Sequence, residues 1–191
     1  MFFQVKKYKE NSVFYRARIS EESGFHKEKM GAPPVGVASS GRANPEGISC
    51  LYLSSDIETA LNEVRAGVHD FVSVGRFVLK DDIEVVDLKN IDRITPFCDI
   101  DYTLHAVNKS SLRRISDEIA KPLRRSDSPL DYIPTQYISD FIKSEKYCGI
   151  EFKSAMMMTG YNLAIFDESL FECVEVAVHK IESLSYKHTI V

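Results

Sequence analysis

The 191-residue sequence lacks the short signatures of several large enzyme classes. It contains no GxxxxGK[ST] loop, no GxGxxG turn, no HExxH and no GxSxG. These motifs position, respectively, a nucleotide phosphate, a dinucleotide, a catalytic zinc ion and a nucleophilic serine. Their absence argues against a P-loop nucleoside triphosphatase, a Rossmann dehydrogenase, a zinc protease and an α/β-hydrolase.

Metal-binding patterns are also missing. The four cysteines, at positions 50, 98, 148 and 173, form no CxxC pair, and no histidine lies at zinc-site spacing from them. Asp99 and Asp101 place two carboxylates on one side of a short segment. A hard cation needs more than two ligands, so a turn near Pro96 explains this pair better. We therefore expect free thiols in a reducing cytoplasm and no metal site.

Long apolar runs and excess positive charge are absent as well. No segment approaches the ~20 apolar residues that span a bilayer, and residues 1–7 do not resemble a secretory signal. With a net charge of -4, the chain has no general attraction to nucleic acid. We expect a soluble, cytoplasmic protein with no membrane contact and no direct nucleic-acid binding.

Two arginine pairs, Arg113–Arg114 and Arg124–Arg125, are local exceptions to this charge balance. Each pair lies in a segment of mixed charge, which favours a solvated helix face. A nucleic-acid binder that uses these four arginines stays open as an alternative. Binding that weakens steeply with salt would support that alternative.

The residues that are present suit one ordinary globular domain, with 44% hydrophobic and 27% charged residues and no internal repeat. Strand patterns occupy both ends of the chain with helices between them, which predicts a single α+β domain over residues 1–191. The predicted strands are residues 13–19, 49–54, 71–79, 83–88, 149–154, 162–166 and 171–181. Residues 80–82 indicate a hairpin between the third and fourth of them.

Three helices are predicted. Ser55 and Glu58 form a capping box that begins a helix over residues 56–66. Apolar spacing predicts a second helix over residues 111–123 and a third that opens at residues 131–136. The third helix is expected to bury Tyr137, Ile138, Phe141 and Ile142.

The most informative stretch is residues 40–65. Arg42 lies in a glycine-flanked loop, Tyr52 in a strand and Glu63 in a helix, and almost no spacer separates these elements. Glu63 falls at the border of the apolar stripe of its helix, which suits a carboxylate that faces a cleft. The loop over residues 21–47 is long, and such loops are usually functional or disordered. The stretch therefore predicts a site in which all three side chains surround one small ligand.

Seven sequence blocks together resemble the RES domain family, which is named for its Arg, Glu and Ser residues. The blocks are residues 15–18 (YRAR), 41–47 (GRANPEG), 51–53 (LYL), 60–65 (ALNEVR), 131–137 (DYIPTQY), 149–154 (GIEFKS) and 162–166 (NLAIF). The blocks follow the order of the family from about residue 14 to 167, and their joint occurrence is far more specific than any single block. One departure is Ala43, which stands where many shorter members have tryptophan. The packing or stacking that this ring supplies must then come from elsewhere.

The resemblance implies an ADP-ribosyltransferase-like fold, with a split β-sheet core and flanking helices, that degrades NAD+. Many such proteins are the toxin of a bacterial toxin–antitoxin pair. By this analogy, the catalytic residues are Arg42, Tyr52, Glu63 and Ser154, and NAD+ is bound by Arg16, Arg42, Asn44, Tyr52 and Asn162. NAD+ is the substrate and no prosthetic group is expected. The expected partner is a small antitoxin with a helix-turn-helix domain, and the oligomeric state, a homodimer included, stays open.

The chemistry of these residue types agrees with the analogy. A guanidinium fork binds a pyrophosphate through paired charge-assisted hydrogen bonds, and a tyrosine ring attracts a flat cation such as nicotinamide by roughly 0.5 to 2 kcal/mol. Glu63 would stabilise the oxocarbenium character that develops at the ribose. Because nicotinamide leaves as a neutral molecule, no second carboxylic acid is needed. Ser154 would orient either the nicotinamide amide or Glu63, and sequence does not choose between the two tasks.

Several outcomes stay open at this stage. The acceptor would be water, inorganic phosphate or a protein side chain, and the resemblance favours water or phosphate. Arg16 taken alone is explained better by a surface ion pair. A different class of function is a module that binds ADP-ribose or a partner protein without turnover. A Glu63→Ala variant with unchanged affinity and biological effect would support that class.

Overall fold

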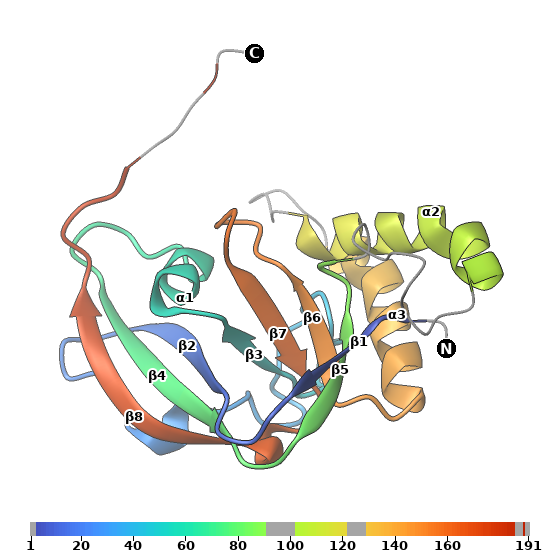
Figure 1. Ribbon diagram of the computed structural model, residues 1–191. Coiled ribbons are helices and arrows are strands. Elements are labelled where there is room, and N and C mark those ends of the chain that lie inside the picture. The colour runs from blue at the N-terminus through green and yellow to red at the C-terminus, as the bar shows by residue number, and fades with distance from the viewer. Residues whose placement is uncertain (1–2, 91–101, 122–128, 186–188, 190–191) are drawn as a thin grey trace.

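One eight-stranded sheet with helices packed against it forms the body of the chain, as the computed structural model in Figure 1 shows. The structure describes residues 3–90, 102–121, 129–185 and 189. The strands are β1 (Val5–Tyr8), β2 (Val13–Ser20), β3 (Leu51–Ser54), β4 (Phe71–Leu79), β5 (Ile83–Asp87), β6 (Gly149–Lys153), β7 (Tyr161–Ile165) and β8 (Phe171–Lys180). The α-helices are α1 (Ile57–Glu63), α2 (Tyr102–Ala120) and α3 (Ile133–Ser144), and short 3-10 turns occupy Lys27–Lys29, Pro129–Tyr132 and Glu168–Leu170.

Strands β2 and β3 are paired at a single position. The strand order of the sheet is β1-β5-β6-β7-β3-β2-β4-β8, and every neighbouring pair is antiparallel except β5 and β6. All of β2 pairs with β4, but β2 meets β3 only at Tyr15 and Ser54. The sheet is therefore split into two halves that share a single bridge. The expected α+β fold with a split sheet and flanking helices is confirmed.

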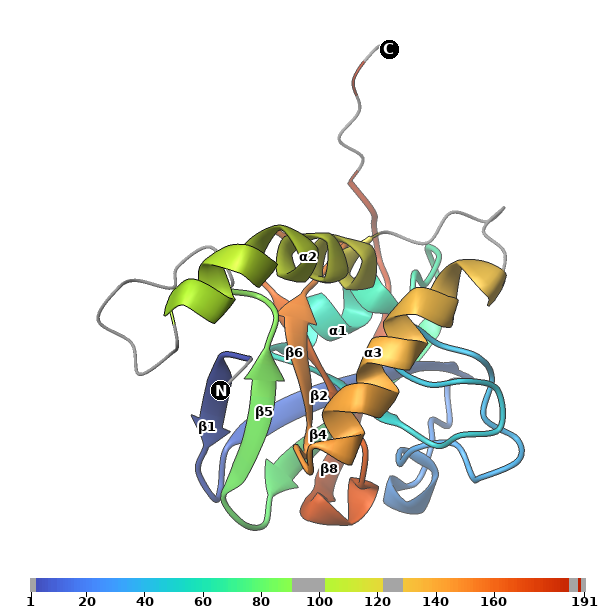
Figure 2. The same cartoon turned by 90° about the vertical axis from the view of Figure 1, so that its right-hand side faces the viewer.

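The helices cover the two halves separately. Helix α1 packs against β2, β3 and β4, whereas α2 and α3 pack against β6 (Figure 2). Side chains alternate between the two faces of each strand. Leu163 and Ile165 of β7 therefore enter one core cluster, and Ala164 enters the cluster shared with Ile119 of α2 and Ile142 of α3.

All seven predicted strands are present, with each end within two residues of its predicted position. Strand β1 was not predicted, since its four residues include two lysines. The hairpin between the third and fourth predicted strands is wrong, because β4 pairs with β2 and β8 while β5 pairs with β1 and β6. Asn11 and Ser12 bond both backbone groups of Leu79, at 2.9 Å each. The end of β4 is thus held by the β1–β2 turn, and the chain crosses to the other half of the sheet.

Helix α1 begins one residue later than the capping box implied. The N-cap is Asp56, whose Oδ1 accepts from the Thr59 backbone N–H at 2.8 Å, while the Ser55 hydroxyl donates to Asp56. The carboxylate next to Ser55 is the better acceptor for a helix N-terminus. The helix ends at Glu63, three residues before the predicted end.

The prediction for the buried face of α3 is half correct. Ile142 is buried and Ile138 packs against the same core cluster, as predicted. Tyr137 and Phe141 are 76% and 46% exposed, so the prediction is wrong for these two residues. Thr135, Gln136 and Ser139 are buried as well. Polar side chains therefore make part of the contact between this helix and the rest of the chain, as described below for Gln136.

Several predicted features fall outside the described residues, namely Asp99, Asp101, Arg124, Arg125 and the end of the second predicted helix at residue 123. That helix begins at Tyr102, earlier than predicted, and Arg113 and Arg114 are exposed on it. Within the described part of the chain, no group of three or more His, Cys, Asp or Glu residues is placed to hold a metal ion. No described helix combines the length and the apolar character that a bilayer span requires.

Candidate functional site

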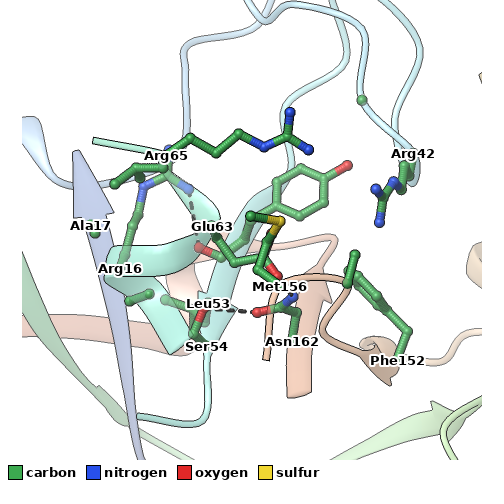
Figure 3. Close-up of a pocket in the computed structure, with 15 residues that line it drawn as sticks. Arg16, Ala17, Arg42, Leu53, Ser54, Glu63, Arg65, Phe152, Met156 and Asn162 are labelled. Atoms are coloured by element: carbon green, nitrogen blue, oxygen red, sulfur yellow. Dashed lines mark hydrogen bonds between the residues drawn. The ribbon is translucent and has the colours of Figure 1, made fainter. Parts of the chain in front are cut away.

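A cavity of about 350 Å³ opens beside the split in the sheet (Figure 3). Five of the seven predicted site residues line it: Arg16, Arg42, Tyr52, Glu63 and Asn162. The sixth, Ser154, contacts Glu63. The seventh, Asn44, lines an adjoining cavity of about 170 Å³ that shares Arg16, Gly41 and Tyr52 with the first. The fold therefore brings together side chains that lie up to 146 positions apart in the sequence.

Two donors hold the carboxylate of Glu63. Its Oε1 accepts a hydrogen bond from the Ser154 hydroxyl at 2.6 Å and another from the Asn162 amide Nδ2 at 2.8 Å. Its Oε2 accepts no hydrogen bond from any residue that the structure describes. One oxygen is thus immobilised, and the other is available to a ligand in the cavity.

Ser154 lies just after β6 and not in the strand as predicted, and its N–H donates to the Gly160 carbonyl at 3.1 Å. Its hydroxyl oxygen accepts the backbone N–H groups of Met156 and Met157, both at 3.1 Å. The single hydroxyl proton of a serine can serve only one strong acceptor. Of the two tasks that sequence left open, the geometry therefore supports the orientation of Glu63.

A glycine permits the approach of α1 to this corner. A Cβ added at Gly160 would lie 2.1 Å from Oγ1 of Thr59, which is buried in α1. Any side chain at position 160 would therefore push the helix away from the β6–β7 turn. The distance between Glu63 on α1 and Ser154 before that turn depends on this close contact.

The loop that carries Arg42 is organised by Asn44 and Tyr52. The Asn44 amide donates to the carbonyls of Ser39, Pro45 and Ile48 at 2.9 to 3.1 Å. Its Oδ1 accepts the Tyr52 hydroxyl at 2.7 Å. Both polar atoms of the Asn44 side chain are thus engaged, Nδ2 by the loop and Oδ1 by Tyr52. This side chain therefore holds the loop of Arg42 in shape.

Tyr52 links the strand to this loop. Its hydroxyl accepts the Ala43 N–H at 2.9 Å while it donates to Asn44. Burial is the main reason why the pKa of Tyr52 is raised well above its usual value, so the hydroxyl keeps the proton that it donates. A Cβ at Gly41 would lie 2.7 Å from this hydroxyl, which explains a glycine there. The ring also lines the cavity, and its stacking on a cation stays a prediction.

Gln136 of α3 holds the same loop from the other side. Its Nε2 donates to the Ser40 hydroxyl and the Gly41 carbonyl at 2.8 Å each, and to the Asn44 carbonyl at 3.1 Å. Gln136 is 8% exposed. The role of this residue was missed by the sequence prediction, although it lies in one of the family-like blocks. Its place in that block was the signal that could have identified it.

Arg42 reaches the end of helix α2. Its NH1 donates at 2.8 Å to the carbonyl of Ile119, the next-to-last residue of that helix. A cation at a helix C-terminus satisfies a free carbonyl and complements the helix dipole. Burial lowers the pKa of Arg42, and the nearby Glu63 opposes this shift. Figure 3 shows Arg42 across the cavity from Glu63 and Asn162.

Arg16 occupies the split in the sheet. Its NH1 donates to the Tyr52 carbonyl at 3.1 Å, so a side chain replaces part of the missing β2–β3 ladder. Burial, and then repulsion from Arg18, lower the pKa of Arg16. Neither Arg16 nor Arg42 makes an ion pair with any residue that the structure describes. The surface ion pair considered as the alternative for Arg16 is therefore not present among these residues.

Ten further residues of the cavity were not predicted as site residues, among them Ser54, Arg65, Phe152 and Met156. Arg65 directly follows the α1 C-cap and has a left-handed backbone with φ of 51°. A left-handed residue directly after the C-cap is a common way for a helix to end, and Lys146 ends α3 in the same way. Among the described residues that line the cavity, the guanidinium groups of Arg16, Arg42 and Arg65 outnumber the one carboxylate, that of Glu63. This charge balance suits an anionic ligand.

Ala43 is 4% exposed and lies in the core cluster with Ile119 and Phe152. Tyr52 packs against the same cluster. Neighbouring side chains thus fill the space beside this small residue. Ile119 of α2 and Phe152 of β6 belong to this cluster, so both elements contribute to the packing around Ala43.

Comparison with known proteins adds the fold and the family. A chain of the M.tuberculosis MbcT-MbcA toxin-antitoxin complex, solved by crystallography, matches with a TM-score of 0.51 and 13% sequence identity, over 91% of this chain and 87% of that chain. At this identity the likeness concerns the fold alone. No curated protein matches the sequence. The RES domain matches residues 13–187, a range that contains all seven predicted site residues. Since this match covers most of the sequence and agrees with the seven blocks, the chain belongs to the RES domain family.

Proposed function

We propose that the chain is an enzyme that degrades NAD+ by cleaving the bond between nicotinamide and ribose. The observation that carries this proposal is the carboxylate of Glu63, which two donors hold at Oε1 and which no described residue bonds at Oε2, in a cavity that three guanidinium groups also line. Such a cavity offers an anion-binding end and a cation-stabilising end within one space. NAD+ presents both a pyrophosphate and a positively charged ring.

The arginines would bind the pyrophosphate. Arg42 uses NH1 on the helix α2 and has four further N–H donors in its fork. Charge-assisted bonds between a guanidinium and a phosphate are among the strongest in proteins, and burial strengthens them further. Asn44, which the sequence analysis assigned to NAD+ binding, would contribute by fixing the loop of Arg42.

Glu63 would act at the other end. Cleavage of the nicotinamide–ribose bond leaves positive charge on the ribose, and Oε2 would stabilise that charge. Both electrons of the breaking bond leave with nicotinamide, which departs neutral and needs no proton. Glu63 is the one acid among the described residues that line the cavity. A single carboxylate is sufficient for this reaction, whereas ordinary glycosidases need two.

The acceptor of the ADP-ribosyl group would be phosphate or water. With water, the products are ADP-ribose, nicotinamide and a proton. With inorganic phosphate, they are ADP-ribose phosphate ester and nicotinamide. The excess of guanidinium groups over carboxylates supports an anionic acceptor as well as an anionic substrate. A protein side chain as acceptor would make the chain a protein ADP-ribosyltransferase.

The biological role that we propose is that of a toxin with a small antitoxin partner. RES family membership supports this role, and the fold likeness to a chain of a toxin–antitoxin complex is consistent with it. The antitoxin would cover the cavity and carry a helix-turn-helix domain. The role is tested by expressing this protein in bacteria alone and together with the product of the neighbouring gene. Growth arrest that the neighbouring gene product relieves supports it, and growth without arrest contradicts it.

Product analysis tests the reaction. Purified protein is incubated with NAD+ that is labelled in its ADP-ribose part, in phosphate-free buffer, with added inorganic phosphate, and with a mixture of proteins. We expect nicotinamide in the first two, and a phosphate ester where phosphate is the acceptor. Glu63→Gln should release none, and Glu58→Gln, at an exposed acid of the same helix, should release as much as the unaltered protein. Label that appears on protein instead would indicate an ADP-ribosyltransferase, and ADP-ribose binding without any nicotinamide release would indicate a binding module.

A further inference from the structure

A chain of three side chains leads from the sheet to Glu63. Ser54, the last residue of β3, is 6% exposed, and its hydroxyl donates to Oδ1 of Asn162 at 2.8 Å. Asn162 in turn donates through Nδ2 to Glu63 at 2.8 Å. Ser54 and Asn162 are direct partners in the antiparallel β3–β7 ladder. Figure 3 shows Ser54 and Asn162 beneath the cavity.

The hydroxyl of Ser54 holds the Asn162 amide in place against the carboxylate. An asparagine side chain has a carbonyl oxygen that only accepts and an NH2 group that only donates. The carboxylate of Glu63 only accepts and therefore takes the NH2 group, and the Ser54 hydroxyl donates to the remaining oxygen. Without Ser54, this buried oxygen would lose its donor and the amide one of the bonds that fix its position. The carboxylate that depends on Asn162 would then lose its fixed position.

Ser54 is also fixed at an unusual point of the fold. It is the residue at which β3 makes its one bridge to β2, so it lies where the two halves of the sheet meet. Its backbone is held by β7 on one side and by Tyr15 on the other. The side chain that begins the relay therefore has a rigid base.

We propose that Ser54 is a positioning residue that acts through Asn162 to hold the Oε1 atom of Glu63, so that Oε2 faces the reacting ribose. This inference rests on the proposed function. Ser54 takes no part in ligand binding through the arginines. Its loss should therefore lower kcat much more than it changes KM. A displacement of about 1 Å at a reacting group costs on the order of 100-fold in rate.

The test compares Ser54→Ala, Ser54→Thr and Asn162→Ala with a matched control. The control is Ser73→Ala, which also removes a fully buried strand hydroxyl. This hydroxyl donates to Ser20 and is not part of the hydrogen bonds that lead to Glu63. We expect Ser54→Ala to reduce kcat for nicotinamide release by about 10- to 100-fold with KM within about twofold. Ser54→Thr, which keeps a hydroxyl, should recover most of kcat, and Ser73→Ala should keep it.

A double variant isolates the route of the effect. If Ser54 acts through Asn162, Ser54→Ala should cause no further loss in an Asn162→Ala background. Additive losses, an unchanged kcat in Ser54→Ala, or an equal loss in Ser73→Ala would overturn the proposal. Thermal unfolding of each variant shows whether a loss of kcat follows a loss of stability, which would also contradict a positioning role.

A measurement without turnover separates this inference from the proposed function. The side-chain amide signals of Asn162, assigned by NMR from their loss in Asn162→Ala, should shift or broaden in Ser54→Ala and in Glu63→Gln, but not in Ser73→Ala. Unchanged signals in Ser54→Ala would refute the relay whatever the activity. Absence of nicotinamide release from the unaltered protein would instead refute the proposed function.

Discussion

The two walls of the cavity are built in different ways. Glu63 is held by Asn162 on β7 and by Ser154 after β6, and Asn162 is held by Ser54 on β3. This carboxylate wall therefore depends on strands paired in register. Of the three arginines, Arg16 lies on the paired strand β2, whereas Arg42 lies in a loop outside the strands. We call the loop of Arg42 the arginine wall, and it depends on side chains such as Gln136 that reach it from elsewhere.

The difference fits the tasks that we propose for the two walls. A group that stabilises a developing charge must be placed accurately before the ligand arrives. A guanidinium that binds a flexible pyrophosphate tolerates more adjustment, since several of its donors can serve. Substitutions in the carboxylate wall should therefore lower kcat, and substitutions in the arginine wall should mainly raise KM. The following variants can break this division or sharpen it.

The largest effect is expected for Glu63→Gln. The amide keeps the shape of the side chain but removes the negative charge from the cavity. We expect kcat for nicotinamide release to fall by at least about 100- to 1,000-fold, as for other preorganised electrostatic groups. Calorimetric affinity for ADP-ribose should change by only a few fold. A variant that retains a tenth of the activity would contradict the role of Glu63.

Arg42→Ala is the corresponding test of the other wall. It removes charge-assisted bonds to the ligand and the bond to the Ile119 carbonyl. Such bonds contribute about 1.5 to 3 kcal/mol each, so KM for NAD+ should rise by about 10- to 100-fold while kcat changes less. Arg42→Lys should recover only part of the affinity because it lacks the planar fork. Arg114→Ala, at an exposed arginine of α2, serves as control. A selective fall in kcat would break the division between the walls.

Gln136→Leu tests how the loop is held. The change keeps the volume roughly constant but leaves the carbonyls of Gly41 and Asn44 without this donor. We expect a stability loss of about 1 to 3 kcal/mol in urea unfolding and faster protease cleavage within residues 31–48. Added ADP-ribose should restore part of the protection, because a bound anion would order the loop through Arg42. Cleavage at the unaltered rate would show that the loop does not depend on Gln136.

Tyr52→Phe should have the smallest effect. It removes the hydroxyl that joins Asn44 and Ala43 but keeps the ring that lines the cavity. We expect a loss of stability of about 1 kcal/mol and a KM within a few fold of the unaltered protein. Tyr52→Leu removes the ring as well and should raise KM further if the ring contacts the nicotinamide. Equal KM values for the two variants would remove the ring from the binding site.

The sequence patterns predicted the elements better than their partners. Period-two alternation located the seven predicted strands, and the border position of Glu63 and the glycines around Arg42 pointed to the cavity. The pairing of β4 and β5 was wrong because a local turn signal does not show whether adjacent strands pair. Tyr137 and Phe141 were wrongly placed on the inward face of α3, because the helix contacts the Arg42 loop through the amide of Gln136.

The role of Ser54 was beyond the reach of any local pattern. Its partner Asn162 lies 108 positions later, and their contact depends on the register between β3 and β7. A shift of this register by one residue would turn one of the two side chains to the other face of the sheet. Sequence blocks can indicate which residues share a site, but such a relay becomes visible only when the strands are paired.

The central claim is that this cavity binds NAD+ and releases nicotinamide from it. Chromatography of NAD+ after incubation with the purified, unaltered protein, with and without inorganic phosphate, tests this claim most directly. The account predicts one nicotinamide for each NAD+ consumed, at a rate that Glu63→Gln abolishes. Intact NAD+ under both conditions, at protein concentrations that match the substrate, would contradict it.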